Sequence, residues 1–263
     1  MTDDYSRELE ICKKLAVSAG EKILEVYNSG EDFEIEHKKD DSPLTRADRA
    51  SNAIIVPALK EAFPDYAVLS EEETDSRERL TKTYCFVVDP LDGTKEFIKR
   101  NGQFTVNIGL AKDHRTVMGV IYVPVTGELF YAAEGTGSFL QLKDQEPVQL
   151  SVSDETDVKK LRFVMSSSHG TPEMDALIEK YGITNFVKMG SSLKGCLVAK
   201  GDAEVYYRYN PTMEWDTCAM QCIAQQAGAI FRQMDDTEMF YNREDSLNAK
   251  GFYIINRSEN RLR

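Results

Sequence analysis

Five short runs rich in β-branched and aromatic residues follow one another through the middle of the chain, at 84–88, 105–111, 117–122, 128–133 and 138–142. Gly, Asp-His and Thr-Gly turns separate these runs. Several strands in succession with short links are typical of an antiparallel sheet. We therefore predict one antiparallel sheet here, which restricts the chain to a small set of layered folds.

Two helices are predicted before this sheet. Apolar residues at helical spacing indicate a first helix over about 4–28 and a second from near Thr45 to about Phe63. The polar stretch between them, at 36–43, is typical of a loop or a short hairpin. Together with the sheet, these helices predict an α+β N-terminal half at 1–155.

The rest of the chain has a different pattern. After a polar connector at 151–160, strand-like and helix-like segments alternate from residue 163 to residue 256. Such alternation predicts a smaller α/β half at 156–263. Because no flexible Gly/Ser linker joins the halves, we expect them to pack against each other.

Composition excludes some classes of function and location. The formal net charge of -12 opposes a role as a general nucleic-acid binder, because nucleic-acid backbones are held mainly by dense Lys and Arg surfaces. The five cysteines lack CxxC spacing and suit buried thiols in a reducing compartment. No apolar run approaches the roughly 20 residues needed to span a bilayer. We expect a cytoplasmic protein without an integral membrane segment.

The segment DPLDGT at 89–94 follows an apolar run that suits a buried strand, and ligands gather at such strand ends. Pro90 favours an extended Asp89, and Gly93 permits a tight turn that can fold Asp92 back beside Asp89. Two carboxylates and a backbone carbonyl are a realistic partial shell for Mg²⁺, which prefers oxygen ligands. The alternative is an Asp-rich turn capped by its own side chains.

Three further acidic positions have structural explanations when taken singly. Glu71 stands in a run of glutamates, which is typical of a solvated surface. Asp216 falls in the first turn of a predicted helix, where acids cap the helix start. Asp48 lies three residues after Thr45, which is capping-box spacing. These residues therefore indicate a site only through their combination and their order along the chain.

That combination resembles the lithium-sensitive inositol monophosphatase superfamily, whose members carry an upstream Asp, a Glu-Glu pair, a DPxDGT turn and a WDxxA helix. Here these motifs read Asp48, Glu71-Glu72, 89–94 and 215–219, and the match spans almost the whole chain. The resemblance implies a sugar-phosphatase-like sandwich of α-β-α-β-α layers and a Mg²⁺-dependent phosphomonoesterase.

Within the superfamily, the continuation DPLDGTKEFI at 89–98 and the segment GSSLK at 190–194 resemble the 3'(2'),5'-bisphosphate nucleotidases of the CysQ type. This resemblance implies adenosine 3',5'-bisphosphate, a by-product of sulfate-transfer reactions in sulfur metabolism, as the substrate. Its sulfated analogue is the second candidate. Inositol monophosphatase and fructose-1,6-bisphosphatase activities stay open, because pocket loops decide specificity on a shared metal core.

The resemblance also implies a role for each site residue. Glu71, Asp89 and the Leu91 carbonyl would hold one Mg²⁺, Asp89, Asp92 and Asp216 a second, and a third, looser ion would lie near Glu71. The catalytic residues would be Asp48, Thr94 and Glu71, with Asp48 polarising the Thr94 hydroxyl toward the attacking water. The substrate would contact Gly93, Thr94, Ser168, His169, Ser192, Lys194 and Arg208.

Other properties are left open by the sequence. The chain could be a monomer or a homodimer, and the resemblance leaves room for peripheral association with the cytoplasmic face of the inner membrane. Some relatives act as regulatory factors, so a binding protein is the alternative from another class. The retained acidic residues favour an enzyme, because a pure binding role would not preserve metal-binding carboxylates.

Overall fold

The computed structural model describes residues 4–30, 32–37, 43–166 and 170–263. The first predicted helix forms as α1 (Ser6–Asn28), whose buried residues include Cys12, Ala16, Ala19 and Ile23 at intervals of three or four. That spacing places them on one face. The second forms as α2 (Arg46–Ala62) with Thr45 as its N-cap, which agrees with the predicted start near Thr45. In the described part of the chain, no helix combines the length and apolar character needed to cross a membrane.

The predicted first sheet has seven strands in the order β3-β4-β5-β6-β7-β8-β9. All neighbours from β4 to β9 are antiparallel, as predicted, and β3 adds a parallel edge beside β4. The strands are β3 (Ala67–Ser70), β4 (Tyr84–Asp92), β5 (Thr105–Lys112), β6 (Arg115–Val123), β7 (Glu128–Ala133), β8 (Gly137–Gln141) and β9 (Val148–Gln149).

The second sheet has five strands in the order β11-β10-β12-β16-β14. Strands β11, β10 and β12 are parallel, whereas β16 runs antiparallel to both of its neighbours. The strands are β10 (Phe163–Ser166), β11 (Phe186–Met189), β12 (Val205–Arg208), β14 (Ile230–Gln233) and β16 (Phe252–Ile255). The α/β character predicted for this half is confirmed.

Short elements complete the chain. Two-residue strands pair as β1 (Glu36–His37) with β2 (Pro43–Leu44), within the stretch predicted as a loop or hairpin, and as β13 (Thr212–Met213) with β15 (Leu247–Asn248). The remaining short segments are helix α3 (Thr94–Ile98) and two 3-10 turns, η1 (Glu78–Thr81) and η2 (Ser258–Asn260).

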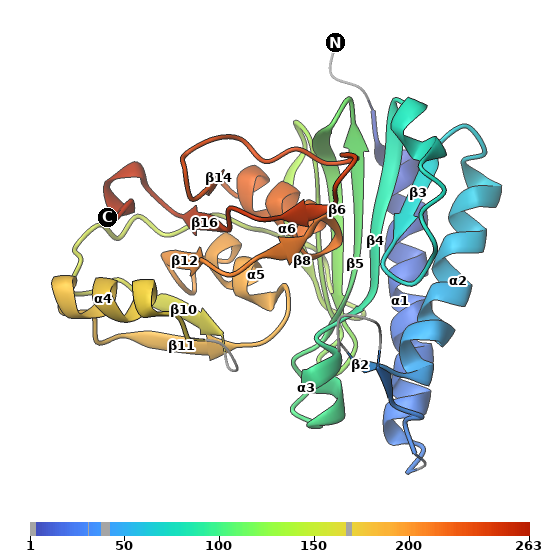
Figure 1. Ribbon diagram of the computed structural model, residues 1–263, viewed down its shortest axis with the longest axis horizontal. Helices are drawn as coiled ribbons and strands as arrows, with labels where there is room; N and C mark the ends of the chain where they lie inside the picture. The colour runs from blue at the N-terminus through green and yellow to red at the C-terminus, as the bar shows by residue number, and fades with distance from the viewer. Residues whose placement is uncertain (1–3, 31, 38–42, 167–169) are drawn as a thin grey trace.

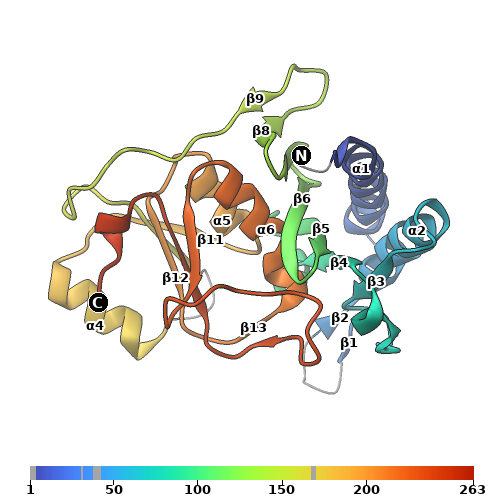
Figure 2. The ribbon, with the colours of Figure 1, turned by 90° about the horizontal axis from the view of Figure 1, so that it is seen from above.

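Helices and sheets alternate in five layers (Figure 1), which confirms the α-β-α-β-α sandwich. Helices α1 and α2 cover the outer face of the first sheet, and α4 (Pro172–Tyr181) packs outside the second. Between the sheets lie α5 (Leu193–Ala199) and α6 (Glu214–Gln226), as Figure 2 also shows. One apolar cluster in this middle layer joins Val87 of β4 to Val164 of β10. The division at residue 155 therefore stays a prediction.

Helix α6 belongs to the C-terminal half but packs on strands β4 to β8 of the first sheet. Two glycines make this close approach possible. A Cβ atom at Gly109 would lie 2.5 Å from Sγ of Cys218, and one at Gly119 would lie 2.3 Å from the carbonyl oxygen of Ala219. Glycine is thus required where the sheet meets the helix. This packing brings the first turn of α6 to the end of β4.

Candidate active site

Strand β4 presents two aspartates on the same face of the sheet because it contains a bulge. Asp89 pairs with Asn107, and Asp92 pairs with Thr105. The three residue positions from Asp89 to Asp92 on β4 therefore lie opposite only two residue positions on β5. In a regular strand, residues three apart point to opposite faces. The extra residue in the bulge returns both side chains to one face.

The cause of this proximity differs from the predicted one. We predicted that a turn at Gly93 folds Asp92 back, but Asp92 is still within β4. Gly93 has a φ of 93° and instead precedes helix α3. The bulge contains Pro90, which has no N–H to offer to a ladder, and the Pro90 carbonyl accepts a hydrogen bond of 2.6 Å from Oγ of Ser51.

Asp89, Asp92 and Asp216 form an acidic triad that could hold a metal ion, since one carboxylate oxygen of each lies within 4.8 Å of the others. Asp216 stands in the first turn of α6, and its Oδ2 accepts a hydrogen bond of 2.6 Å from the backbone N–H of Met213. The capping explanation for Asp216 is therefore correct, and it coexists with a place in the triad.

Burial and mutual repulsion disfavour ionisation of Asp89 and Asp216. Burial, followed by the charges of Glu71, Asp92 and Asp216, raises the pKa of Asp89 well above its ordinary value. Burial and the charge of Asp92 raise the pKa of Asp216 to about 8. A cation among the carboxylates would oppose both effects, because opposite charge favours the ionised form.

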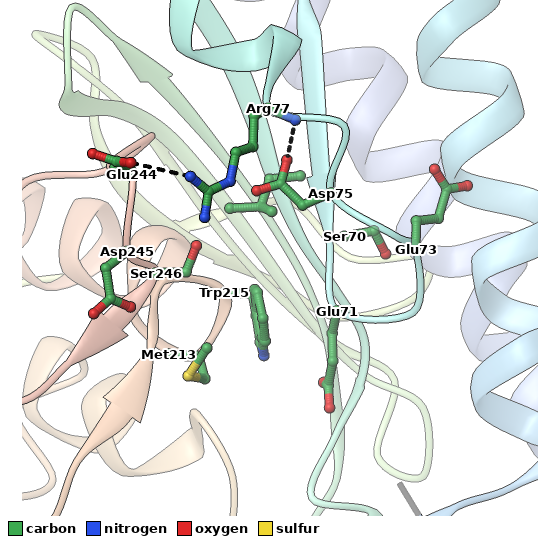
Figure 3. Close-up of a pocket in the computed structure, with 11 residues that line it drawn as sticks. Ser70, Glu71, Glu73, Asp75, Arg77, Met213, Trp215, Glu244, Asp245 and Ser246 are labelled. Carbon is green, nitrogen blue, oxygen red and sulfur yellow. Dashed lines mark hydrogen bonds and ion pairs between the residues drawn. The ribbon is translucent and has the colours of Figure 1, made fainter. Parts of the chain in front are cut away.

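Glu71 joins the triad from the adjacent strand. It follows β3, and its backbone N–H donates to the Val88 carbonyl over 3.1 Å, while its side chain is hydrogen-bonded to Asp89. Glu71 also lines a cavity of about 570 Å³. In Figure 3, the segment after β3 that carries Glu71 forms one wall of this cavity, and the segment 244–246 forms the other.

Asp48 and Thr94 are also brought together, at the start of two helices. The Thr94 hydroxyl lies 3.2 Å from Oδ1 of Asp48 and 3.4 Å from the Leu91 carbonyl oxygen. Burial raises the pKa of Asp48 to about 6, and the nearby charge of Glu72 adds to this effect, although hydrogen bonds from Thr45 oppose it. Such a carboxylate can exchange a proton near neutral pH.

A second cavity, of about 150 Å³, lies on the other side of the triad, with Asp92 and Asp216 in its wall. Four predicted substrate residues also line it: Gly93, Ser192, Lys194 and Arg208. Burial lowers the pKa of Lys194 to about 8, and its Nζ donates to the Ser191 carbonyl over 2.6 Å. Nε of Arg208 is buried and lacks a hydrogen-bond partner among the described residues.

Two predicted substrate residues, Ser168 and His169, lie outside the described residues. Ser166, just before them, lines the smaller cavity. The backbone N–H and the hydroxyl of Ser192 both donate to Oδ2 of Asp92, over 2.6 and 2.7 Å. Ser192 thus supports an acid of the triad, and its contact with substrate stays a prediction.

Sequence reasoning missed two polar residues beneath the triad, Thr105 and Asn107 of β5. They are 0% and 1% exposed, and the Thr105 hydroxyl donates to Oδ1 of Asn107 over 2.9 Å. A signal was present in the sequence: both interrupt a strand-like run whose other members, such as Val106 and Ile108, are apolar. Buried polar side chains usually have a hydrogen-bonding purpose.

A family model described as the inositol monophosphatase family matches residues 4–260. Among curated proteins, the 3'(2'),5'-bisphosphate nucleotidase CysQ of Salmonella typhimurium is 39% identical, over 93% of this chain and 98% of that protein. The protein of the same name from Haemophilus influenzae is 31% identical over 92% of this chain and 90% of its own length.

Solved structures with a similar fold include the two that follow. CysQ from Bacteroides thetaiotaomicron, described as a bacterial member of the inositol monophosphatase family, has a TM-score of 0.84 at 41% identity and covers 96% of this chain and 98% of its own. The extragenic suppressor protein suhB from Bartonella henselae has a TM-score of 0.79 at 23% identity, with 96% and 94% covered. At that identity the likeness shows the fold alone.

Proposed function

The chain belongs to the inositol monophosphatase family, and we propose that it is a 3'(2'),5'-bisphosphate nucleotidase. Its reaction would convert adenosine 3',5'-bisphosphate to AMP and phosphate, with the sulfated analogue as a second substrate. The observation that carries the proposal is the placement of two cationic side chains, Lys194 and Arg208, in the same small cavity as Asp92 and Asp216. Such a cavity offers separate sites for two phosphate groups.

The residues at the triad suit Mg²⁺. The atoms that would bind the metal are all oxygen, which is the ligand type that Mg²⁺ prefers. The buried carboxylates also repel one another, and a cation would relieve this repulsion. Two or three ions would be held by Glu71, Asp89, the Leu91 carbonyl, Asp92 and Asp216. When bound, Mg²⁺ would neutralise charge on the transferred phosphoryl group and make a water molecule more acidic.

Asp48 and Thr94 would orient the attacking water and take up its proton. Because the Thr94 hydroxyl donates to Asp48, the lone pairs of its oxygen can accept a hydrogen bond from water. The proton of Thr94 could then pass to Asp48, whose pKa of about 6 makes it a suitable acceptor at neutral pH. Glu71 would contribute to catalysis through its side-chain hydrogen bond to Asp89.

Lys194 and Arg208 would bind the phosphate that is not cleaved. Lys194 uses one of its three N–H groups on the Ser191 carbonyl, so two can serve a ligand. The buried Nε of Arg208 has no hydrogen-bond partner in the described part of the chain. A phosphate oxygen would satisfy these donors with charge-assisted hydrogen bonds.

The first test compares phosphate release from adenosine 3',5'-bisphosphate, inositol 1-phosphate and fructose 1,6-bisphosphate with Mg²⁺ at equal concentrations. We expect the nucleotide to be strongly preferred. Preference for either sugar phosphate would keep the metal site and contradict the nucleotide assignment.

A second test isolates the phosphate that is not cleaved. Lys194→Met should lower kcat/KM for adenosine 3',5'-bisphosphate by roughly 10- to 100-fold, the usual value of a hydrogen bond to a charged group. It should leave kcat/KM for 3'-AMP, which lacks the second phosphate, nearly unchanged. Lys200→Met is the matched control, because Lys200 lies at the other end of α5 and pairs with Asp202. Equal losses on both substrates would contradict this role.

A further inference from the structure

We propose that Asn107 is a positioning residue that, together with Ser192, holds the Asp92 carboxylate in one orientation, so that its Oδ1 atom is the one presented to a metal ion. The inference rests on the proposed function, because it takes Asp92 as a metal ligand.

Asn107 makes three hydrogen bonds below the triad. Its Nδ2 donates to Oγ of Ser192 over 2.8 Å and to Oδ2 of Asp92 over 3.3 Å. Its Oδ1 accepts from the Thr105 hydroxyl over 2.9 Å. These bonds use both N–H groups of the amide and leave no donor of Asn107's side chain unpaired.

Thr105 determines which way the Asn107 amide faces. A hydroxyl that donates to Oδ1 requires that end of the amide to face Thr105. With the amide reversed, Oδ1 would lie against the Asp92 carboxylate oxygen, and two acceptors would face each other. Because Thr105 and Asn107 are two residues apart on β5, their side chains point to the same face of the sheet.

Within the described residues, all the hydrogen bonds to the Asp92 carboxylate reach one oxygen. Oδ2 accepts from the N–H of Ser192 at 2.6 Å, from its hydroxyl at 2.7 Å and from Asn107 at 3.3 Å. These donors restrict rotation of the carboxylate, and Oδ1 is left to bind a cation. Outer contacts of this kind orient metal ligands in general.

The contacts also join three elements that are distant in sequence. Ser192 precedes α5, and its Oγ lies 3.2 Å from the carbonyl oxygen of Asp216 in α6. Asn107 therefore connects β5 to the ligand on β4 and to the starts of both middle helices. Its effect on metal binding should exceed that of a buried asparagine elsewhere.

Isothermal titration calorimetry of the full chain with Mg²⁺ tests this inference, combined with thermal unfolding in a chelator. Asn107→Leu keeps a similar volume and removes the donors, and it should raise the Mg²⁺ dissociation constant by about 10- to 100-fold. Thr105→Val is isosteric and should raise it by about 2- to 10-fold, as expected for one neutral hydrogen bond. Excess Mg²⁺ should restore most of kcat in both variants.

Asn256→Leu is the matched control. Asn256 is 1% exposed, and its Nδ2 donates to the carbonyls of Ser153 and Glu155, away from the triad. It should lower the unfolding temperature without changing the Mg²⁺ dissociation constant. If Asn107→Leu does not fold, Thr105→Val decides the question.

Two outcomes would overturn the inference while leaving the proposed function intact: unchanged Mg²⁺ affinity in both β5 variants, or equal weakening in Asn256→Leu. Absence of Mg²⁺ binding by the unmodified chain would overturn the proposed metal site itself, and the inference with it.

Discussion

The hydroxyl of Thr94 donates to Oδ1 of Asp48 over 3.2 Å, although 46 residues separate the two in sequence. The other oxygen of Asp48, Oδ2, accepts from the N–H and the hydroxyl of Thr45 over 2.8 and 2.6 Å, which caps α2. One carboxylate therefore both caps a helix and contacts the site. The rigid start of α2 holds the Thr94 partner in place.

Replacing either member of this pair should lower kcat with little effect on folding. We expect Thr94→Val and Asp48→Asn each to reduce kcat by roughly 10²- to 10⁴-fold, the usual contribution of a positioned proton acceptor. The double variant should be little worse than the single ones, because the two residues act as a unit. Thr171→Val, which removes the cap of α4, is the control and should keep full kcat. Multiplicative losses would contradict the pairing.

The acid limb of the pH profile should report Asp48. Since the pKa of Asp48 is about 6, kcat should fall below that pH with unit slope. Glu72→Gln should move the midpoint to lower pH, because the charge of Glu72 is one cause of the raised pKa. If the midpoint is the same in Glu72→Gln as in the unmodified chain, Asp48 is not the titrating group.

The raised pKa of Asp48 makes stability change with pH in the opposite direction to activity. The folded chain binds the Asp48 proton more tightly than the unfolded chain, whose Asp pKa is 3.8. Between 3.8 and about 6, this group therefore makes the free energy of unfolding fall as pH rises, and above that range its contribution is constant. Urea unfolding across this pH range should show a shallower fall in Asp48→Asn than in the unmodified chain.

Asp89→Asn should abolish activity and raise stability in the absence of metal. Turnover should be abolished because the proposed shared metal ligand is lost. In a chelator, the unfolding temperature should rise by a few degrees, since the neutral amide relieves repulsion in the triad and about 1 kcal/mol corresponds to roughly 2–4 °C. Added Mg²⁺ should no longer stabilise this variant. Asp235→Asn, at an exposed aspartate paired with Lys250, should keep both turnover and the response to Mg²⁺.

Arg79 should be far more important for stability than its neighbour Arg77. Its buried guanidinium makes two hydrogen bonds to Asp75 and donates to Oδ1 of Asn242 and to the Arg243 carbonyl. These contacts tie the segment that follows Glu71 to the loop beyond β14. Removing one partner of a buried ion pair costs about 3–5 kcal/mol, so Arg79→Ala should lower the free energy of unfolding by that order.

Arg77→Ala is the comparison. Arg77 is 62% exposed and pairs with Glu244, which is 77% exposed, and such surface pairs contribute about 1 kcal/mol or less. Urea unfolding of both variants gives the difference directly. Equal effects would show that the Arg79 contacts do not hold the two segments together.

Much of the fold could be predicted because each element carries a local signal. The apolar run before Asp89 is typical of a buried strand, and Thr45 and Asp48 have capping-box spacing, which the structure confirms. The acidic motifs could be found because they stand at strand ends and helix starts. Such signals depend on residues that are close in sequence.

Features that depend on pairing between distant residues were not predictable. The bulge that turns Asp92 toward Asp89 is a property of register with β5, and Pro90 indicates only that the strand is irregular. The approach of α6 depends on Gly109 and Gly119, whose small size has meaning only against the helix that they meet. The bonds from Ser192 to Asp92 likewise cross between the halves.

The position of α6 also determines when a growing chain becomes an enzyme. A ribosome releases the N-terminal segments first, so Glu71, Asp89 and Asp92 emerge long before residues 214–226. Until α6 is made, the inner face of the first sheet lacks this cover and the triad lacks Asp216. A chain that stalls before this helix should therefore lack phosphatase activity and expose the apolar inner face of the first sheet.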